Sequence, residues 1–169
     1  MVWARTRLTI WEDLFPPVKK IYFRFEGKYP EKFYAKINEL LKKIFAVPDA
    51  YIQEKEYNWK KTENGHKFKI VWSLMKPFDR WSYLNMEIDL KGYSENGYGK
   101  ASIEFEPRVV TEFPQDYAWQ QTVFYEVCRK LWDSIFYKRK REKIYDESKE
   151  LCMRFQAELK HFGVLLNES

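Results

Sequence analysis

Four acidic residues provide the sharpest chemical hypothesis in this sequence. They occupy every second position of two short segments, as Glu87 and Asp89 in one and Glu104 and Glu106 in the other. Because the side chains of a β-strand alternate between its two faces, pairing of these segments as strands places all four carboxylates on one face. Carboxylate oxygens are the ligands of hard cations such as Ca²⁺, and crowding raises the pKa of one member of such a group. The four residues are therefore candidate metal ligands.

A plainer interpretation of the same residues is a solvated, charged face. Like charges directly opposite each other destabilise a strand pair, and lysines of the preceding segment can offset them. Matching the apolar residues of the two neighbouring segments brings Lys69 beside Glu87 and Lys67 beside Asp89. Exposed ion pairs of this kind are common and individually weak. This interpretation requires no bound metal.

A basic run lies near the C-terminus. Residues 138–143 carry a net charge of +4, against +5 for the whole chain. Basic side chains contact phosphates and aromatic side chains stack on bases, so this run is a candidate contact to a nucleic acid or another anion. The alternative is a solvated face of a predicted helix, since no RNA-binding motif accompanies the run. The residues concerned are Lys138, Arg139, Lys140, Arg141 and Lys143.

No residue pattern in the sequence indicates catalysis. The two histidines, His66 and His161, have no serine, cysteine or aspartate partner at the spacing of a catalytic motif. The sequence contains no glycine-rich phosphate loop and no zinc-binding pair of cysteines. Cys128 and Cys152 fall at apolar positions of the C-terminal region, where we expect buried free thiols in a reducing cytosol. We therefore expect no cofactor and favour a protein that is not an enzyme.

Composition favours one soluble globular domain, with 45% hydrophobic and 33% charged residues in a chain of 169. The aromatic content of 19% is high, and Tyr and Trp suit binding surfaces as well as cores. Abundant Lys and Glu with few Gly and two Cys are typical of a thermophilic source. The apolar runs are too short to span a bilayer, and the first residues lack the apolar core of a signal peptide. We expect a cytoplasmic protein with no membrane partner.

Residues 51–106 are expected to form four antiparallel strands joined by tight turns. Alternating apolar residues give each strand one buried face and one wetter face. Asn64-Gly65 and Asn96-Gly97 favour type I′ turns, because both central residues of such a turn need a positive φ. The pairs predicted from these turns are Leu90 with Ile103, Ile88 with Phe105, Tyr57 with Trp72, and Trp59 with Ile70.

Two helical stretches are expected to cover one face of this sheet. A strand over 21–26 precedes a helix over 30–46, whose apolar residues recur at helical spacing. A second helix is expected to begin near Asp116 or Tyr117 and to lay an apolar stripe on the sheet. The residues of that stripe are Phe124, Val127, Cys128, Leu131 and Ile135.

Another apolar stripe follows the basic run, and Gly163 is expected to end its helix. Projected at about 100° per residue, this stripe is rotated by roughly 100° from the preceding one. Either the helix breaks near the basic run, or one long helix packs on different partners along its length. Residues 144–162 are accordingly expected to fold back on the domain, swap into a second copy or form a helical dimer. The stripe consists of Leu151, Cys152, Phe155, Leu159 and Phe162.

The predicted fold class is α+β. An antiparallel meander of four or more strands, with an additional N-terminal strand, is packed on one face by the helix at 30–46 and a long C-terminal helix. We expect an N-terminal arm at 1–20, an α+β domain at 21–137, and a basic block with a helical extension at 138–169.

This order of elements over about residues 21–136 resembles that of the helix-grip, or START-like, superfamily. The resemblance rests on element order, and one helix rather than two follows the first strand. It implies a hydrophobic small molecule held between sheet and helix, whereas a filled core is the alternative. The residues that would line such a space are Tyr57, Trp59, Trp72, Met86 and Phe105.

The function expected from the sequence is non-enzymatic binding. The partner is another protein, a second copy of the chain through residues 144–162, or an apolar ligand between sheet and helix. Nucleic-acid binding through residues 138–143 is the alternative.

Overall fold

The computed structural model describes residues 6–115, 117, 120 and 122–168. Its six strands are β1 (Thr6–Asp13), β2 (Ile21–Lys28), β3 (Ile52–Thr62), β4 (Gly65–Pro77), β5 (Ser82–Glu95) and β6 (Tyr98–Gln115). Its helices are α1 (Lys32–Phe45), a short 3-10 turn (Asp49–Tyr51), α2 (Val123–Trp132), a π-helical turn (Asp133–Tyr137) and α3 (Lys138–Glu168). No helix in this part of the chain is both long and apolar enough to cross a membrane.

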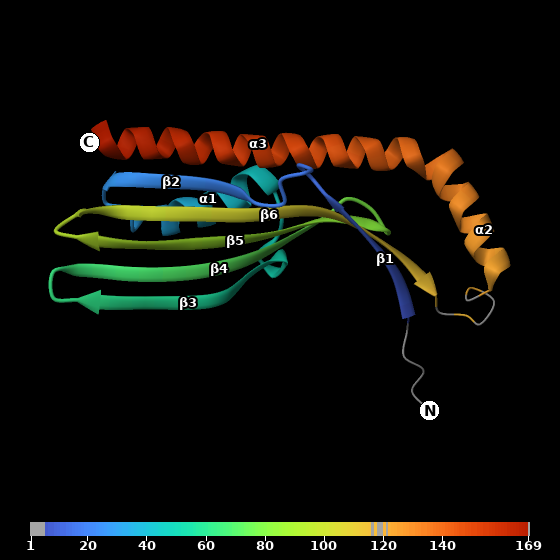
Figure 1. Cartoon of the computed structure of the whole chain (residues 1–169), viewed down its shortest axis with the longest axis horizontal. Coiled ribbons are helices and arrows are strands. Elements are labelled where there is room, and N and C mark those ends of the chain that lie inside the picture. The colour runs from blue at the N-terminus through green and yellow to red at the C-terminus, as the bar shows by residue number, and fades with distance from the viewer. Residues whose placement is uncertain (1–5, 116, 118–119, 121, 169) are drawn as a thin grey trace, which may run out of the picture.

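The six strands form one antiparallel sheet (Figure 1). Strands β3 to β6 are a meander, so each strand pairs with its neighbour in sequence. Strand β6 is 18 residues long, and β2 and β1 pair with its first and second halves along the same edge. The predicted α+β class and antiparallel meander are confirmed.

The turn at Asn96-Gly97 forms as the sequence predicts. Both residues have positive φ, 52° at Asn96 and 79° at Gly97, which a type I′ turn requires. This turn sets the register of β5 on β6, with Leu90 opposite Ile103 and Ile88 opposite Phe105, as predicted.

The turn predicted at Asn64-Gly65 lies one residue earlier in the structure, so the prediction is wrong by one residue. Thr62 pairs with Gly65, so the turn residues are Glu63 and Asn64, and Gly65 is the first residue of β4. A Cβ atom on Gly65 would lie 1.7 Å from the carbonyl oxygen of Ser94, so this glycine is needed for close approach of two strands. The pairs across β3 and β4 shift accordingly, and Tyr57 lies opposite Ile70 and Trp59 opposite Phe68.

Strand β4 pairs with β5 in a register that is shifted by four residues from the predicted one, so that prediction is wrong. Lys69 lies opposite Lys91 rather than Glu87, and Asp89 lies opposite Val71. The cause is the connecting loop, in which the Asp79 carboxylate accepts hydrogen bonds of 2.7 Å from the backbone amides of Trp81 and Ser82. This turn makes the connection longer than a tight hairpin. An even shift leaves every side chain on its predicted face, so the buried face is unchanged.

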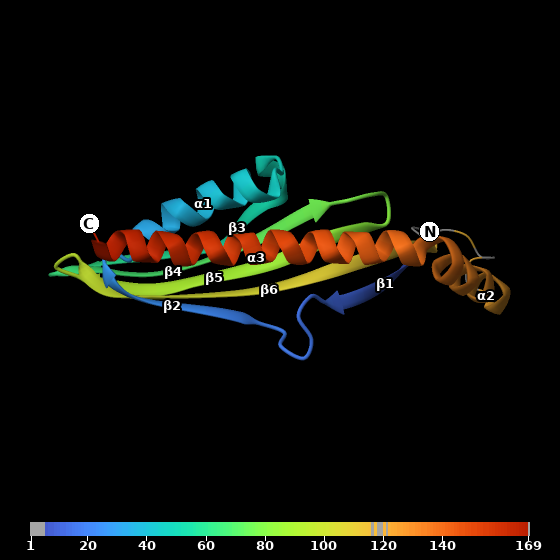
Figure 2. The same ribbon diagram turned by 90° about the horizontal axis from the view of Figure 1, so that it is seen from above.

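The core lies between one face of the sheet and the pair of helices α1 and α3, which run along it (Figure 2). From α1, Phe33 packs edge-on against Phe25 of β2 and Phe162 of α3, with ring centroids 5.0 and 5.2 Å apart. From α3, Phe155 packs edge-on against Phe105 of β6 at 5.5 Å. Aromatic contacts therefore join the sheet, α1 and α3.

The apolar stripe at 144–162 is the one that covers the sheet. Cys152, Phe155 and Leu159 of α3 are completely buried. The helix does not end at Gly163, as predicted, but continues to Glu168. Gly163 is instead a point of close contact, where a Cβ atom would lie 3.1 Å from the Phe25 ring. Of the three alternatives expected for residues 144–162, packing on the domain is the one that the structure shows.

Candidate functional site

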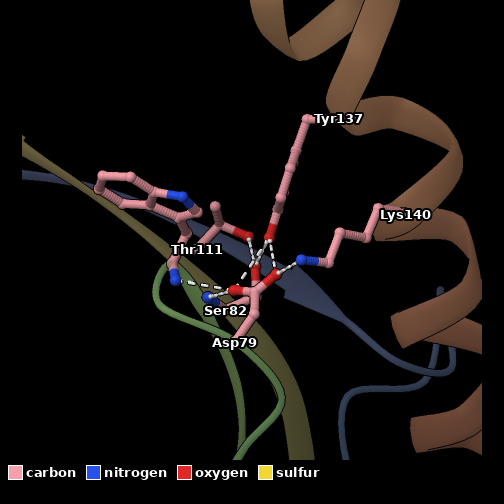
Figure 3. A network of polar contacts seen from close by, with 6 residues as sticks. Asp79, Ser82, Thr111, Tyr137 and Lys140 are labelled. Atoms are coloured by element: carbon pink, nitrogen blue, oxygen red, sulfur yellow. Dashed lines mark hydrogen bonds and ion pairs between the residues drawn. The ribbon is translucent and has the colours of Figure 1, made fainter.

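A buried polar network holds the π-helical turn to the end of the sheet (Figure 3). The Tyr137 hydroxyl lies 2.5 Å from the Ser82 hydroxyl and donates to the Asp79 carboxylate at 3.1 Å. Ser82 also bonds Thr111 of β6 at 2.9 Å, and the Lys140 ammonium pairs with Asp79 at 2.8 Å. The π-helical turn, α3, β6 and the β4–β5 loop therefore meet at one polar point.

The protonation states in this network suit anchoring. Burial raises the pKa of Tyr137 to about 12, so its hydroxyl remains a donor at neutral pH. Partial burial alone would raise the pKa of Asp79, but hydrogen bonds from Lys140, the amides of Trp81 and Ser82, and Tyr137 outweigh it and hold the pKa below its ordinary value. The resulting carboxylate accepts from all of these donors. The network links groups to one another and leaves no exposed nucleophile.

Sequence reasoning missed this network. The local signal was an aspartate followed by backbone amides two and three residues later, the pattern of an Asx turn at Asp79. Tyr137 and Thr111 carry no such signal, because they meet Asp79 and Ser82 through the fold alone.

Helix α2 turns its polar side toward the body of the protein. A stripe of residues four apart, Tyr125, Arg129, Asp133 and Tyr137, is partly or fully buried. The Arg129 guanidinium lies over the Phe113 ring, 5.4 Å from its centroid. Asp133 accepts hydrogen bonds of 3.0 and 3.1 Å from Arg141. These contacts fix the rotation of the helix about its axis.

The opposite side of this segment is apolar and exposed. We call it the α2 apolar face, and each of its side chains is between 51% and 77% exposed. Trp132 and Phe136 touch each other within it, with ring centroids 5.0 Å apart. Its members are Val123, Phe124, Val127, Leu131, Trp132, Ile135 and Phe136.

The prediction that this stripe covers the sheet is therefore wrong. Helix α2 lies at the end of the strands and bends away from the axis of α3 (Figure 1), and it meets the sheet through Arg129 on Phe113 rather than through its apolar stripe. Cys128 is exposed for the same reason, contrary to expectation, whereas Cys152 is buried as expected and burial raises the pKa of its thiol to about 12. A hollow of about 290 Å³ adjoins the face. It is lined by Trp81, Phe113, Tyr125, Cys128, Arg129 and Trp132.

The basic run is only partly available to a ligand. Lys140 is paired with Asp79, and Arg141 with Asp133 and, at 3.6 Å, with Glu12. Lys138, Arg139 and Lys143 are exposed, and they form no ion pair with any residue that the structure describes. These three cations follow directly on the α2 apolar face.

The four carboxylates do face one another across β5 and β6, with Glu87 opposite Glu106 and Asp89 opposite Glu104. Each has a cation of its own, and the pairs are Glu87 with Lys55, Asp89 with Lys91, Glu104 with Lys20, and Glu106 with Arg108. Within the described part of the chain, no group of three or more His, Cys, Asp or Glu residues could hold a metal ion. The contacts are those of a charged face whose carboxylates are ion-paired, with the Glu87 side chain 55% exposed and the other three 21–25% exposed. Lys69, predicted beside Glu87, pairs with Glu56 at 2.6 Å instead.

The five predicted ligand-binding residues divide into two groups. Trp72, Met86 and Phe105 are buried in the core. Tyr57 is exposed and Trp59 half-buried, and both lie with Trp72 around the ring of Tyr34, a residue of α1 that the sequence did not single out. An open hollow of about 800 Å³ lies elsewhere on the sheet, and none of the five lines it.

The two histidines lie on different elements, His66 on β4 and His161 on α3. His66 is half-buried and its Nδ1 accepts a hydrogen bond of 3.4 Å from the Trp59 indole, whereas His161 is exposed on α3.

No protein-family model matches this chain, and no curated protein matches it. Among solved structures, it is similar to a Staphylococcus aureus protein of unknown function, with 8% identity, 90% of this chain and 98% of that chain covered, and a TM-score of 0.23. It is also similar to Ara h 8.0201, with 11% identity, coverage of 80% and 97%, and a TM-score of 0.21. A third structure, an uncharacterized protein from Rhizobium leguminosarum, has 11% identity, coverage of 90% and 99%, and a TM-score of 0.19. An antiparallel sheet with a long C-terminal helix is compatible with the helix-grip arrangement, and scores this low support no statement about function.

Proposed function

We propose that this chain is a non-enzymatic interaction protein whose binding element is the α2 apolar face. The sheet, α1 and α3 form a packed scaffold, and the polar network at Tyr137 holds the binding element at its end. Its proposed role is docking onto another surface, not catalysis of a reaction.

One observation carries this proposal: residues 123–137 direct Arg129, Asp133 and Tyr137 inward and their apolar stripe outward. Amphipathic helices of globular proteins normally do the opposite, because burying an apolar side chain stabilises a protein by roughly 1.5–3 kcal/mol. Contiguous exposed apolar patches mark interaction sites in soluble proteins. The seven side chains of the α2 apolar face, each more than half exposed, form such a patch.

We infer in addition a relation to the helix-grip superfamily, supported by the order of elements and by the long C-terminal helix on the sheet. A ligand between sheet and helix is a weaker proposal than docking. Trp72, Met86 and Phe105 pack against neighbouring side chains, and Phe105 contacts the Phe155 ring at 5.5 Å. A ligand in that place would have to displace core side chains.

Hydrophobic interaction chromatography on a phenyl resin tests whether the face is available. The double variant Leu131→Gln and Ile135→Gln removes two exposed apolar side chains and retains good helix-forming residues. We expect it to elute clearly earlier than the wild type, at higher ammonium sulfate concentration.

A matched variant provides the control. Val164→Gln with Leu165→Gln changes two apolar residues of α3 that are 55% and 47% exposed. We expect a much smaller shift, because these two side chains lie outside the α2 apolar face. Equal shifts for the two double variants would overturn the proposal that this face is the docking element.

A further inference from the structure

The charges around the α2 apolar face indicate the kind of surface it docks on. Residues 123–143 contain seven basic and three acidic residues, a net charge of +4. Lys130, Lys138, Arg139 and Lys143 are exposed and have no ion-pair partner in the described part of the chain. Glu126 and Glu142 are exposed on the same segment as well, so the unpaired charges that border the apolar side chains sum to +2.

This charge disfavours a second copy of the same face as the occupant. Two copies docked face to face would each bring this positive excess to one interface, and like charges held together are destabilising. An anionic surface has the complementary charge.

The shape of the element favours a broad surface over a small ligand. Helix α2 projects from one end of the molecule, past the ends of the strands, in both views (Figures 1 and 2). A projecting helix with Trp132, Phe124 and Phe136 on one side and lysines and arginines beside them has the composition of helices that lie in the interfacial layer of a membrane. Trp is favoured at that depth because its ring is apolar and its N–H is polar.

The anchoring network supplies a fixed orientation. Tyr137 and Lys140 connect the π-helical turn and the start of α3 to Asp79. The apolar side chains and the cations of residues 138–143 are therefore held on one rigid element, which reduces the ordering cost of binding.

We propose that the α2 apolar face and the adjoining cations dock the protein on an anionic lipid surface as an interfacial helix. This proposal rests on the proposed docking function and names its partner. It departs from the expectation of no membrane partner, which rested on the lack of an apolar run long enough to span a bilayer; an interfacial helix needs no such run.

Co-sedimentation with vesicles tests the proposal directly. One set of vesicles is phosphatidylcholine alone, and the other contains about 30 mol% phosphatidylserine as the anionic lipid. We expect the full-length protein to bind the anionic vesicles, to bind neutral vesicles weakly, and to be released as salt rises from about 0.05 M to about 0.5 M, because salt screens the attraction.

Two variants separate the apolar from the electrostatic contribution. Leu131→Gln with Ile135→Gln should reduce binding at every salt concentration. Changing Lys138, Arg139 and Lys143 to Gln together should weaken binding to the anionic vesicles by up to about a hundredfold and remove most of its salt dependence.

The matched control removes three charges that lie away from α2. Lys43, Lys60 and Lys61 are exposed and unpaired among the described residues, and the β3–β4 turn next to Lys60 and Lys61 lies opposite α2 (Figure 1). Changing these three lysines to Gln should leave vesicle binding close to that of the wild type. Equal losses in the two triple variants would show a nonspecific charge effect and overturn the proposal.

The remaining outcomes separate this proposal from the one on which it rests. No vesicle binding, with chromatographic retention that still depends on Leu131 and Ile135, overturns the lipid partner and leaves the docking face in place. In that case, a dimer in sedimentation velocity that the double variant dissociates would identify a second copy as the occupant. If the retention does not depend on these residues, the docking function itself is wrong.

Discussion

Tyr137 and Asp79 illustrate how a few polar atoms can position a whole helix. Tyr137 is buried at the junction of two helical segments, and its hydroxyl reaches both Ser82 and Asp79. A buried polar group is costly unless it is hydrogen-bonded, so this site is satisfied in one orientation of the π-helical turn. The network therefore determines where α2 points.

Removing the Tyr137 hydroxyl should destabilise the protein. Tyr137→Phe leaves the ring in place but takes away a donor to Asp79 and a partner of the buried Ser82, at a cost of about 1–2 kcal/mol in the free energy of unfolding. Urea denaturation measures this change. Tyr22→Phe, at an exposed tyrosine of β2, should alter the free energy of unfolding by less than about 0.5 kcal/mol. A Tyr137→Phe variant as stable as the wild type would contradict the anchoring role.

The stability that Asp79 contributes should depend on pH. Its pKa in the folded protein lies below the ordinary value of 3.8, so the folded state favours the ionised form. The contribution is fully present above the ordinary pKa and is lost as pH falls through the folded pKa. The difference in unfolding free energy between wild type and Asp79→Asn should therefore shrink as the pH is lowered from about 6 to about 3. A constant difference across this range would show that ionisation of Asp79 does not stabilise the fold.

At the scale of elements, α3 covers the core. Cys152, Phe155 and Leu159 lie at helical spacing and are completely buried against the sheet and α1. Gly163 extends this contact, because the absence of a Cβ atom lets the helix approach Phe25. By contrast, α2 buries none of its described residues.

The different roles of the two helical segments predict different effects of truncation. Leu159→Ala should destabilise the protein by about 2–5 kcal/mol, because it leaves a cavity in a packed core. Leu165→Ala, on the exposed side of the same helix, is the matched control and should cost under about 1 kcal/mol. Thermal or urea unfolding measures both. A small effect of Leu159→Ala would mean that α3 does not seal the core in solution.

At the scale of the whole molecule, a packed scaffold is separate from the exposed α2 apolar face, the proposed binding element. The aromatic residues that dominate the composition join the layers of the scaffold, as in the contacts of Phe33 with Phe25 and Phe162. The charged face of the sheet is neutralised by pairs such as Lys55 with Glu87. Four exposed cations without an ion pair among the described residues, Lys130, Lys138, Arg139 and Lys143, lie on the segment that carries the α2 apolar face, which is why the proposed docking is placed at that end.

The sequence by itself determined the class of fold and the buried face of β4, β5 and the first half of β6, whereas β1 falls in the segment expected to be an arm. Alternation of apolar residues is a local property, and an even shift in register leaves it intact, so the buried face was predicted correctly even where β4 and β5 pair four residues from the expected register. The turn at Asn96-Gly97 was also predictable, because its two positive φ values constrain residue type locally.

Only the tertiary structure decided which apolar stripe became core and which became surface. The stripes of α2 and α3 look alike in sequence, since periodicity reports that a helix has an apolar side and not what lies against it. The length of the sheet and the anchor at Tyr137 place α3 over the strands and α2 beyond them. The candidate site was therefore invisible to sequence analysis, because exposure is a property of the assembled fold.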